Sequence, residues 1–266
     1  MLRPRITPCL LVHNGGLVKT VTFGNPKYVG DPINAVKIFN EKEVDEIIVV
    51  DIDASVHGNE PDYVLIKNLA AECRMPLCYG GGVNSVKQVE EIIALGVEKV
   101  AISSAAIGNP NLIGEAAATV GSQSIVVIMD VKKVETRERY EVFIHNGKEG
   151  TGLSPVEFAR TAEELGAGEL VINSIDCDGL MTGYDLQLAG MVREATNLPM
   201  TVLGGAGSLK DIATLIEVFG TIGAAAGSLF VFKGNFRAVL INYPSRSEKD
   251  ALARHAHPVL EASQGA

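Results

Sequence analysis

Short apolar runs, rich in β-branched residues, alternate along this chain with longer stretches of helical periodicity. The runs are continuously apolar, which is typical of parallel strands covered on both faces. They predict eight strands, at residues 6–12, 46–52, 76–79, 99–102, 124–130, 169–173, 200–203 and 223–226. Helical patterns lie between them, as at residues 86–95, 155–165 and 209–219. Repeated strand–helix units predict an α/β domain, either a closed barrel or a doubly wound sheet.

An internal repeat favours the barrel. Residues 81–87 (GGVNSVK) resemble residues 204–210 (GGAGSLK), which lie 123 positions later. The same offset relates Asp53 to Asp176. Two like halves of four strand–helix units can close on one another, whereas a doubly wound sheet has no reason to repeat itself. The predicted fold is therefore a single (β/α)8 TIM barrel with a twofold half-barrel internal repeat.

Composition adds limits to this prediction. A barrel of this type occupies about 250 residues as one domain, so residues 1–243 are assigned to it and the polar residues 244–266 to a loosely ordered C-terminal extension. The net charge of −9 argues against nucleic acid or a membrane as partner. The polar start and the lack of long apolar runs predict a cytoplasmic protein. The four cysteines lack metal-site spacing and are expected to be reduced, with no metal and no cofactor.

Glycine- and serine-containing turns follow four predicted strands, at equivalent places in the two halves. Glycine lets the backbone approach a ligand closely, and a helix N-terminus beyond it favours an anion. The pattern predicts two phosphate sites that face each other across the barrel mouth, and hence a ligand with a phosphate at each end. The alternative is that these are only tight turns. The candidate phosphate-binding residues are Gly82, Ser103, Ser104, Gly205, Gly227 and Ser228.

Carboxylates at the ends of strands are candidates for proton transfer in a barrel. Asp130 ends the fifth strand, and Asp53 and Asp176 follow the second and sixth. The alternative is that they cap the following loops. Between the two halves, Leu11 corresponds to Asp130, so a mechanism that needs a carboxylate at both places would have to use Asp53 or Asp176.

Two long loops are expected to cover the mouth. Residues 12–28 are rich in glycine and carry Lys19 near their centre, and residues 131–152 are charged and lack a helical period, which suggests a hairpin lid. At the opposite end of the barrel, four charged residues begin predicted strands. They could pair into a ring, which would either plug the floor or form a polar gate on an axial passage. These residues are Arg5, Glu46, Lys99 and Glu169.

Several motifs together resemble the cyclase subunit of imidazole glycerol phosphate synthase, over residues 1–243. They are residues 6–10, 30–32, 51–55, 80–82, 121–124, 174–179, 182–185 and 204–207. The resemblance implies a heterodimer with a glutaminase subunit that docks on the barrel floor. It implies that ammonia passes the gate and reaches a bis-phosphate nucleotide, which is converted to imidazole glycerol phosphate and an aminoimidazole carboxamide ribotide.

The resemblance also implies residue roles. The four floor residues match the family's ammonia gate, the glycine–serine turns match its phosphate sites, Lys19 matches the lysine of its mobile loop, and Asp130 matches one of two catalytic aspartates. Ser103 departs mildly, because the family usually has Asn there. Leu11 stands where the family has its other catalytic aspartate, which puts lyase-type cyclase activity in doubt.

Residues 9–12 with 16–20 resemble instead a paralogue group found with surface-polysaccharide genes. That resemblance implies a barrel that activates a glutaminase and channels ammonia to a separate sugar amidotransferase. Three hypotheses therefore remain: a cyclase in which Asp53 or Asp176 replaces the missing aspartate, an ammonia conduit, and an isolated isomerase-like barrel.

Overall fold

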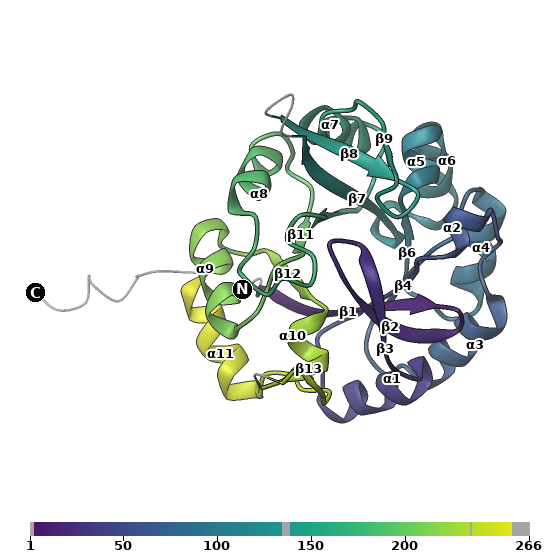
Figure 1. Cartoon of the computed structure of the whole chain (residues 1–266). Helices are drawn as coiled ribbons and strands as arrows, with labels where there is room; N and C mark the ends of the chain where they lie inside the picture. Colours follow the sequence, from purple (N-terminus) through teal and green to yellow (C-terminus); the bar gives the residue numbers. More distant parts are fainter. Residues whose placement is uncertain (1–2, 135–138, 235, 257–266) are drawn as a thin grey trace, which may run out of the picture.

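The computed structural model describes residues 3–134, 139–234 and 236–256. Eight parallel strands close into a barrel, so the predicted TIM barrel is confirmed (Figure 1). Pairing of the first strand with the last, and of the fifth with the sixth, completes the circle. The barrel strands are β1 (Arg5–His13), β4 (Ile47–Asp51), β5 (Leu77–Gly80), β6 (Lys99–Ile102), β7 (Ile125–Val134), β10 (Glu169–Ser174), β11 (Met200–Leu203) and β12 (Gly223–Ala226).

Helices surround the barrel and bury its outer face. Many begin at a side-chain cap, as where Ser85 and Ser208 accept from the backbone N–H three residues on. The outer helices are α1 (Pro32–Glu41), α3 (Tyr63–Glu72), α4 (Val86–Ala94), α6 (Asn111–Val120), α7 (Pro155–Glu164), α8 (Leu186–Arg193) and α9 (Leu209–Phe219). Short helical turns follow three strands: α2 (Ala54–His57), α5 (Ser104–Gly108) and α10 (Ser228–Val231). A further turn, η1 (Ser122–Ser124), lies between α6 and β7.

The barrel has a small core of its own, separate from the strand–helix core. It contains Cys9, Ile48, Cys78, Ala101, Val126, Ile128 and Val171. Alternation along a strand then places every second residue inside the barrel. On β1 these residues are Arg5, Thr7, Cys9 and Leu11, so the charged floor, the apolar middle and the mouth follow one another along the axis.

Two hairpins rise over the C-terminal ends of the strands (Figure 1). The first joins the end of β1 to β2 (Gly16–Val21) and β3 (Gly24–Gly30). The second pairs the end of β7 with β8 (Arg139–Ile144), followed by β9 (Glu149–Gly150). Both loops predicted to cover the mouth are therefore hairpins.

The chain after the barrel forms a short pair, β13 (Phe232–Lys233) and β14 (Ala238–Val239), and then α11 (Arg246–His255). Helix α11 begins with a capping box between Ser245 and Glu248, and buries Leu252. It packs beside α9 (Figure 1). Helix α11 lies within the predicted extension 244–266, of which residues 257–266 lie outside the described residues. No helix in the described part of the chain has the length and hydrophobicity needed to cross a membrane.

Candidate functional site

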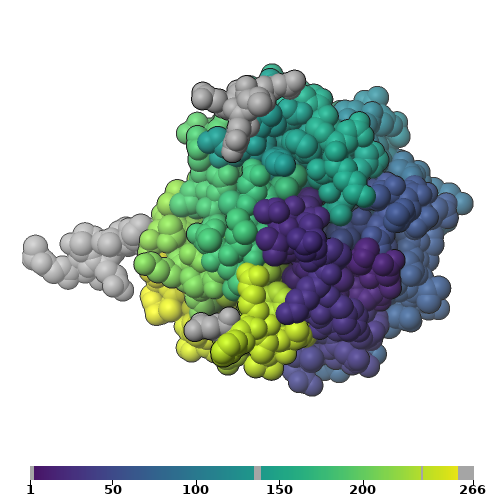
Figure 2. Space-filling model, in the orientation of Figure 1, coloured from purple at the N-terminus to yellow at the C-terminus, as the bar shows by residue number. Residues whose placement is uncertain are grey.

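A pocket opens at the C-terminal ends of the barrel strands, beneath the two hairpins. Every candidate phosphate residue lines it, together with Lys19 and Asp130. Figure 2 shows this face, where the β2–β3 hairpin (purple) covers the centre of the barrel. The internal repeat therefore converges on one opening, which is the usual location of the site in a TIM barrel.

The first half-barrel contributes Gly82, Ser103 and Ser104. The φ angle of Gly82 is +73°, and a Cβ atom there would lie 2.7 Å from the carbonyl oxygen of Asn59. Only glycine fits this turn, which supports a close approach of the backbone to a ligand. Ser104 begins α5, and its hydroxyl accepts a 3.1 Å hydrogen bond from the backbone N–H of His145 in the second hairpin. The hairpin therefore closes directly over this turn.

The second half-barrel contributes Gly205, Gly227 and Ser228. Gly205 has a φ angle of +103°, and a Cβ there would collide with the carbonyl oxygen of Gly183. The amino group of Lys19 lies against Gly227, where it would be 2.6 Å from an added Cβ. The turn at Gly227 thus has the Lys19 side chain beside it, whereas the turn at Ser104 has the backbone of the second hairpin beside it.

Lys19 is buried although its hairpin is a surface element. Its ammonium group donates a 2.6 Å hydrogen bond to the carbonyl oxygen of Cys9. Burial lowers the pKa of Lys19, and the negative charge of Asp178 opposes that shift. A phosphate at the adjacent Gly227 turn would compensate this buried charge.

Asp130 lies at the bottom of the pocket, half-buried, with Leu11 lining the same space. Desolvation raises the pKa of Asp130 to about 6, although a 2.9 Å hydrogen bond from the amide of Asn173 opposes the shift. A carboxyl group with a pKa near 6 can both accept and return a proton near neutral pH. The amide oxygen of Asn173 is buried and has no hydrogen-bond partner among the described residues.

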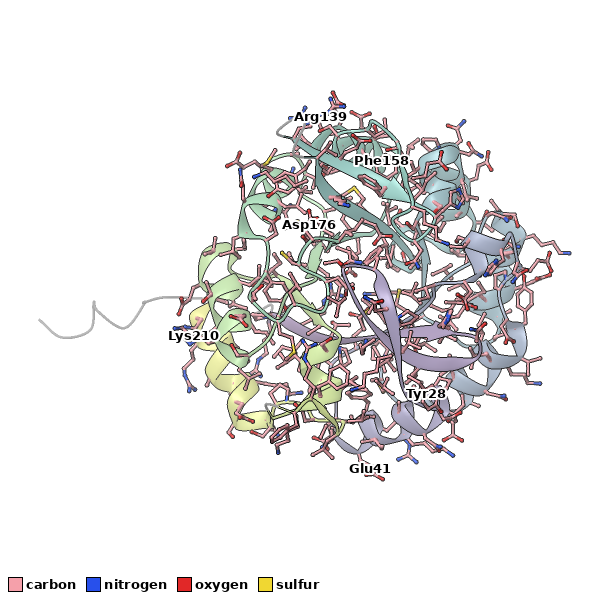
Figure 3. The ribbon with its side chains drawn as sticks, viewed as in Figure 1. Tyr28, Glu41, Arg139, Phe158, Asp176 and Lys210 are labelled. Atoms are coloured by element: carbon pink, nitrogen blue, oxygen red, sulfur yellow. The ribbon has the colours of Figure 1, made fainter. Side chains whose placement is uncertain are left out.

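The structure places Asp53 and Asp176 away from the pocket lining. Asp53 accepts from the backbone N–H of Asn14 at 2.8 Å, and its other oxygen lies 2.7 Å from Nδ1 of His13. Burial would raise the pKa of Asp53, but these two partners lower it overall. Asp176, on the turn after β10 (Figure 3), accepts from the backbone N–H of Lys133 at 2.8 Å. Both contacts match the alternative that these carboxylates hold loops.

Asp178, two residues beyond Asp176, does line the pocket and fastens the first hairpin over it. Its carboxylate accepts from the hydroxyl of Thr20 at 2.6 Å and from the backbone N–H of Phe23 at 3.1 Å. The two hairpins also meet, because the ring of Phe23 lies against Gly147. The mouth is therefore closed over by both hairpins.

The sequence interpretation missed Asn173 and the hydrogen bonds by which Asp178 holds the first hairpin, called here the Asp178 latch. Asn173 could have been found from the alternation of inward and outward side chains along a strand, because it lies four residues after the inward-facing Glu169. The Asp-Cys-Asp turn showed two carboxylates, but the local pattern does not tell which one turns toward the hairpin.

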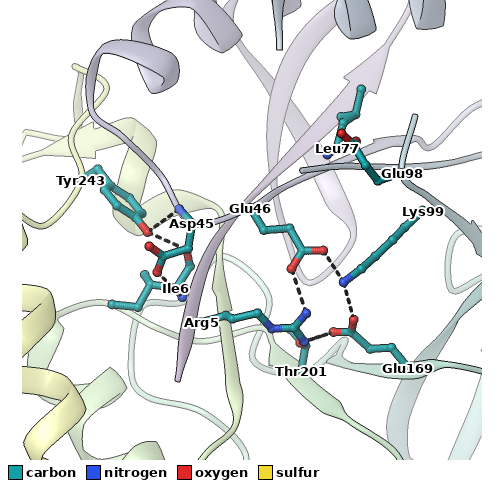
Figure 4. Close-up of polar contacts among 10 residues, drawn as sticks. All are labelled: Arg5, Ile6, Asp45, Glu46, Leu77, Glu98, Lys99, Glu169, Thr201 and Tyr243. Carbon is teal, nitrogen blue, oxygen red and sulfur yellow. Dashed lines mark hydrogen bonds and ion pairs between the residues drawn. The ribbon is translucent and has the colours of Figure 1, made fainter. Parts of the chain in front are cut away.

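The four charged residues at the other end of the barrel do form a closed ring, called here the floor ring (Figure 4). Arg5 donates to Glu46 at 3.0 Å and to Glu169 at 2.5 Å. Lys99 donates to the same two carboxylates, at 2.6 and 2.8 Å. Each cation thus bridges both anions, and the hydroxyl of Thr201 adds a bond of 2.7 Å to Glu169.

Charge pairing compensates the burial of the floor ring. Burial by itself would raise the pKa of Glu169 and lower that of Lys99, yet the opposite charges reverse both shifts. Arg5, Lys99 and Glu169 are consequently ionised at neutral pH. The ring joins residues of four barrel strands at the floor.

Other chemistry has little support in the described residues. No three His, Cys, Asp or Glu side chains gather there as a metal site would require. All four cysteines are free, as expected for reduced thiols, and burial raises the pKa of Cys9 to about 11. Cys9 is therefore a neutral thiol rather than a nucleophile.

The fold and the site define a class: a twofold-repeated (β/α)8 barrel with a pocket at its mouth, beneath two hairpins, and a charged ring at its floor. The chain belongs to the family described as histidine biosynthesis protein, which matches residues 5–237.

Relatives match over nearly the whole chain. A Leptospira interrogans protein, provisionally named imidazole glycerol phosphate synthase subunit HisF, is 57% identical over 95% of this chain and 99% of its own. A Pseudomonas aeruginosa protein, provisionally named subunit hisF2, is 49% identical over 94% and 99%. The Lactococcus lactis imidazole glycerol phosphate synthase subunit HisF is 44% identical over 86% and 89%. The chain is thus a HisF-like subunit of a cyclase-type enzyme family.

Proposed function

We propose that this chain is the barrel subunit of a glutamine amidotransferase, which accepts ammonia from a glutaminase docked on its floor. The supporting observation is that one barrel carries the floor ring at one end and the closed, glycine–serine-lined pocket at the other. The axis between them is the shortest route from the floor to the pocket. The names of the relatives, which are synthase subunits, fit a heterodimer.

The ligand proposed for the pocket carries two phosphates, one at each glycine–serine turn. Lys19 would neutralise the phosphate at Gly227, and the N-terminal backbone of the short helices would donate to both. In the cyclase reaction of the family, a bis-phosphate nucleotide and ammonia yield imidazole glycerol phosphate and an aminoimidazole carboxamide ribotide. Asp130, which lines the pocket and has a pKa of about 6, is a group that can transfer a proton to or from such a ligand. A cytoplasmic location fits phosphorylated ligands and glutamine.

A second candidate function is favoured by Leu11. Its side chain lines the pocket where a second proton-transfer group would be needed, and it has no titratable atom. Asp53 and Asp176 contact the two hairpins, at Asn14 and Lys133, and are absent from the pocket lining, which argues against either as a substitute. This arrangement favours a barrel that activates a glutaminase and passes ammonia to a separate sugar amidotransferase, with little chemistry of its own.

The glutaminase partnership is tested by capture. The tagged chain, expressed in its source cells, should co-purify with an activity that releases glutamate from glutamine. Lys42 lines a hollow at the floor together with Arg5. Lys42→Glu should reduce that activity severalfold, because it reverses a charge where the partner would dock. The matched control is Lys132→Glu at the mouth, which should leave it unchanged. Glutamate release that is absent, or reduced equally by both variants, contradicts the proposal.

The choice between the two functions rests on position 11. With ammonium and the bis-phosphate substrate of imidazole glycerol phosphate synthase, the unaltered chain should form product slowly. Leu11→Asp should accelerate product formation by about 10²-fold or more, the usual contribution of one general acid or base. Leu11→Asn, similar in size but not titratable, is the control. A fast unaltered chain, or equal gains in both variants, would show that Leu11 does not limit the chemistry.

A further inference from the structure

Behind the floor ring lies a second set of polar contacts that the ring itself does not include. Asp45, the residue before Glu46, accepts a 3.1 Å hydrogen bond from the backbone N–H of Ile6, the residue after Arg5. Tyr243 accepts from the backbone N–H of Asp45 at 3.2 Å and donates to the carbonyl oxygen of Ile6 at 2.7 Å (Figure 4). We call these three residues the Asp45–Tyr243 network.

The network takes the place of strand pairing. Strands β1 and β4 are in register from Cys9 opposite Ile48 onward. Three residues earlier, the same register sets Ile6 opposite Asp45, below the start of β4. There the side chains of Asp45 and Tyr243 satisfy backbone groups that the ladder no longer pairs. They therefore fix the two strand ends that carry Arg5 and Glu46.

The same device recurs beside Lys99. Glu98 precedes it and accepts a 2.8 Å hydrogen bond from the backbone N–H of Leu77 (Figure 4). Strands β5 and β6 are in register with Cys78 opposite Lys99, so Leu77 stands opposite Glu98. In both places, an acidic residue that directly precedes a floor-ring residue accepts a hydrogen bond from the neighbouring strand: Asp45 from β1 and Glu98 from β5.

Of these two devices, within the described residues, the one at Asp45 continues into the C-terminal helix. Lys249 of α11 donates to the second carboxylate oxygen of Asp45 at 2.8 Å and to the carbonyl oxygen of Glu43 at 3.0 Å. Its ammonium group also lies 5.2 Å from the centre of the Tyr243 ring. Helix α11 is therefore connected to the floor ring through one carboxylate.

We infer that Asp45 and Tyr243 are positioning residues for the floor ring, and that Lys249 couples α11 to it. Their function as parts of an ammonia gate rests on the proposed function, whereas their effect on the ring does not. A ring of four side chains from four strands closes only if the strand ends stay in register. Loosening the Arg5–Glu46 side of the ring leaves Glu46 less firmly placed for Lys99.

The test reads the ring in the isolated full chain, through the acetylation rate of Lys99 measured by peptide mass spectrometry. The exposed Lys87 in the same sample is the internal reference. Tyr243→Phe removes the hydroxyl but keeps the ring beside Phe230. Lys99 should then react about fivefold faster relative to Lys87, which corresponds to about 1 kcal/mol. Lys249→Met should change the rate in the same direction, by less.

The matched control is Tyr184→Phe. Tyr184 is also a buried tyrosine that donates to a barrel carbonyl, that of Ala225 at 3.0 Å, but it is not in contact with the floor ring. The inference is overturned if Lys99 reactivity stays unchanged in both test variants, or if Tyr184→Phe raises it equally. If Tyr243→Phe does not fold, the rate in Lys249→Met decides alone. No partner is needed, so failure to capture a glutaminase would reject the proposed function and leave this result standing.

Discussion

Three aspartates near the mouth of the barrel share the same side chain but differ in burial and in hydrogen-bond partners. Asp130, Asp53 and Asp178 are all aspartates at strand ends, yet burial dominates the first, hairpin contacts dominate the second, and the third has both. The pKa values follow these surroundings: that of Asp130 is raised to about 6, and that of Asp53 is lowered. Residue type and position in a strand therefore indicate which residues are candidates for proton transfer. Burial and hydrogen bonding in the folded protein distinguish between these candidates.

The raised pKa of Asp130 predicts a pH-dependent stability. Because the folded pKa of about 6 exceeds the ordinary value of 3.8 for an aspartate, ionisation costs folded-state stability, and the cost grows as pH rises from about 4 through 6. Asp130→Asn should therefore raise the free energy of unfolding at pH 8 by about 1–2 kcal/mol, less than the full shift implies because the carboxylate opens into the pocket. At pH 4 most of this gain should vanish. Denaturant unfolding at both pH values measures it, and a gain independent of pH would refute the assignment.

At the scale of elements, the first hairpin is fastened to the barrel at its tip. Its contacts are those of Thr20, Thr22 and Phe23 with Asp178, and Thr22 donates its backbone N–H to the carbonyl oxygen of that residue at 2.9 Å. Because these bonds converge on one turn, that turn controls whether Lys19 stays buried beside Gly227.

If the hydrogen bonds to Asp178 hold the first hairpin down, their removal should let that hairpin open locally. Asp178→Ala should raise hydrogen exchange of the amides in β2 and β3 about tenfold, the factor expected for losing a hydrogen bond to a charged group. Exchange in the barrel strands should stay unchanged. The control is Asp176→Ala, which removes a carboxylate from the same turn that bonds to Lys133 rather than to the first hairpin. Equal exchange in the hairpin of both variants would show that Asp178 is not the latch.

At the scale of the whole molecule, the two half-barrels place chemically different groups at equivalent positions. The glycine–serine turns are alike in both halves, whereas Leu11 stands in one half where Asp130 stands in the other. A ligand with a phosphate at each end would use the matching glycine–serine turns of both halves. Proton transfer from both halves would need a second carboxylate at position 11. The two halves therefore share the glycine–serine turns at the pocket but not the carboxyl group of Asp130, for which the other half has Leu11.

The chain beyond the barrel also acts at this scale. Helix α11 buries Leu252 and reaches the floor through Lys249, so the terminal segment is part of the surface around the floor ring. Polar composition alone suggested a loose tail. The Ser245–Glu248 capping box was readable in the sequence, but its packing beside α9 was not.

The sequence by itself determined the barrel, its eight strands and its twofold repeat, because continuous apolar runs and a fixed offset are local or directly comparable signals. It also indicated the floor ring, since charged residues at inward strand starts have few partners except one another. Tertiary structure alone decided which carboxylate lies in the pocket, how the hairpins close and how α11 reaches Asp45. Those outcomes depend on contacts between segments more than 100 residues apart, such as Thr20 with Asp178, 158 residues apart, and Asp45 with Lys249, 204 residues apart. No local pattern encodes such pairings.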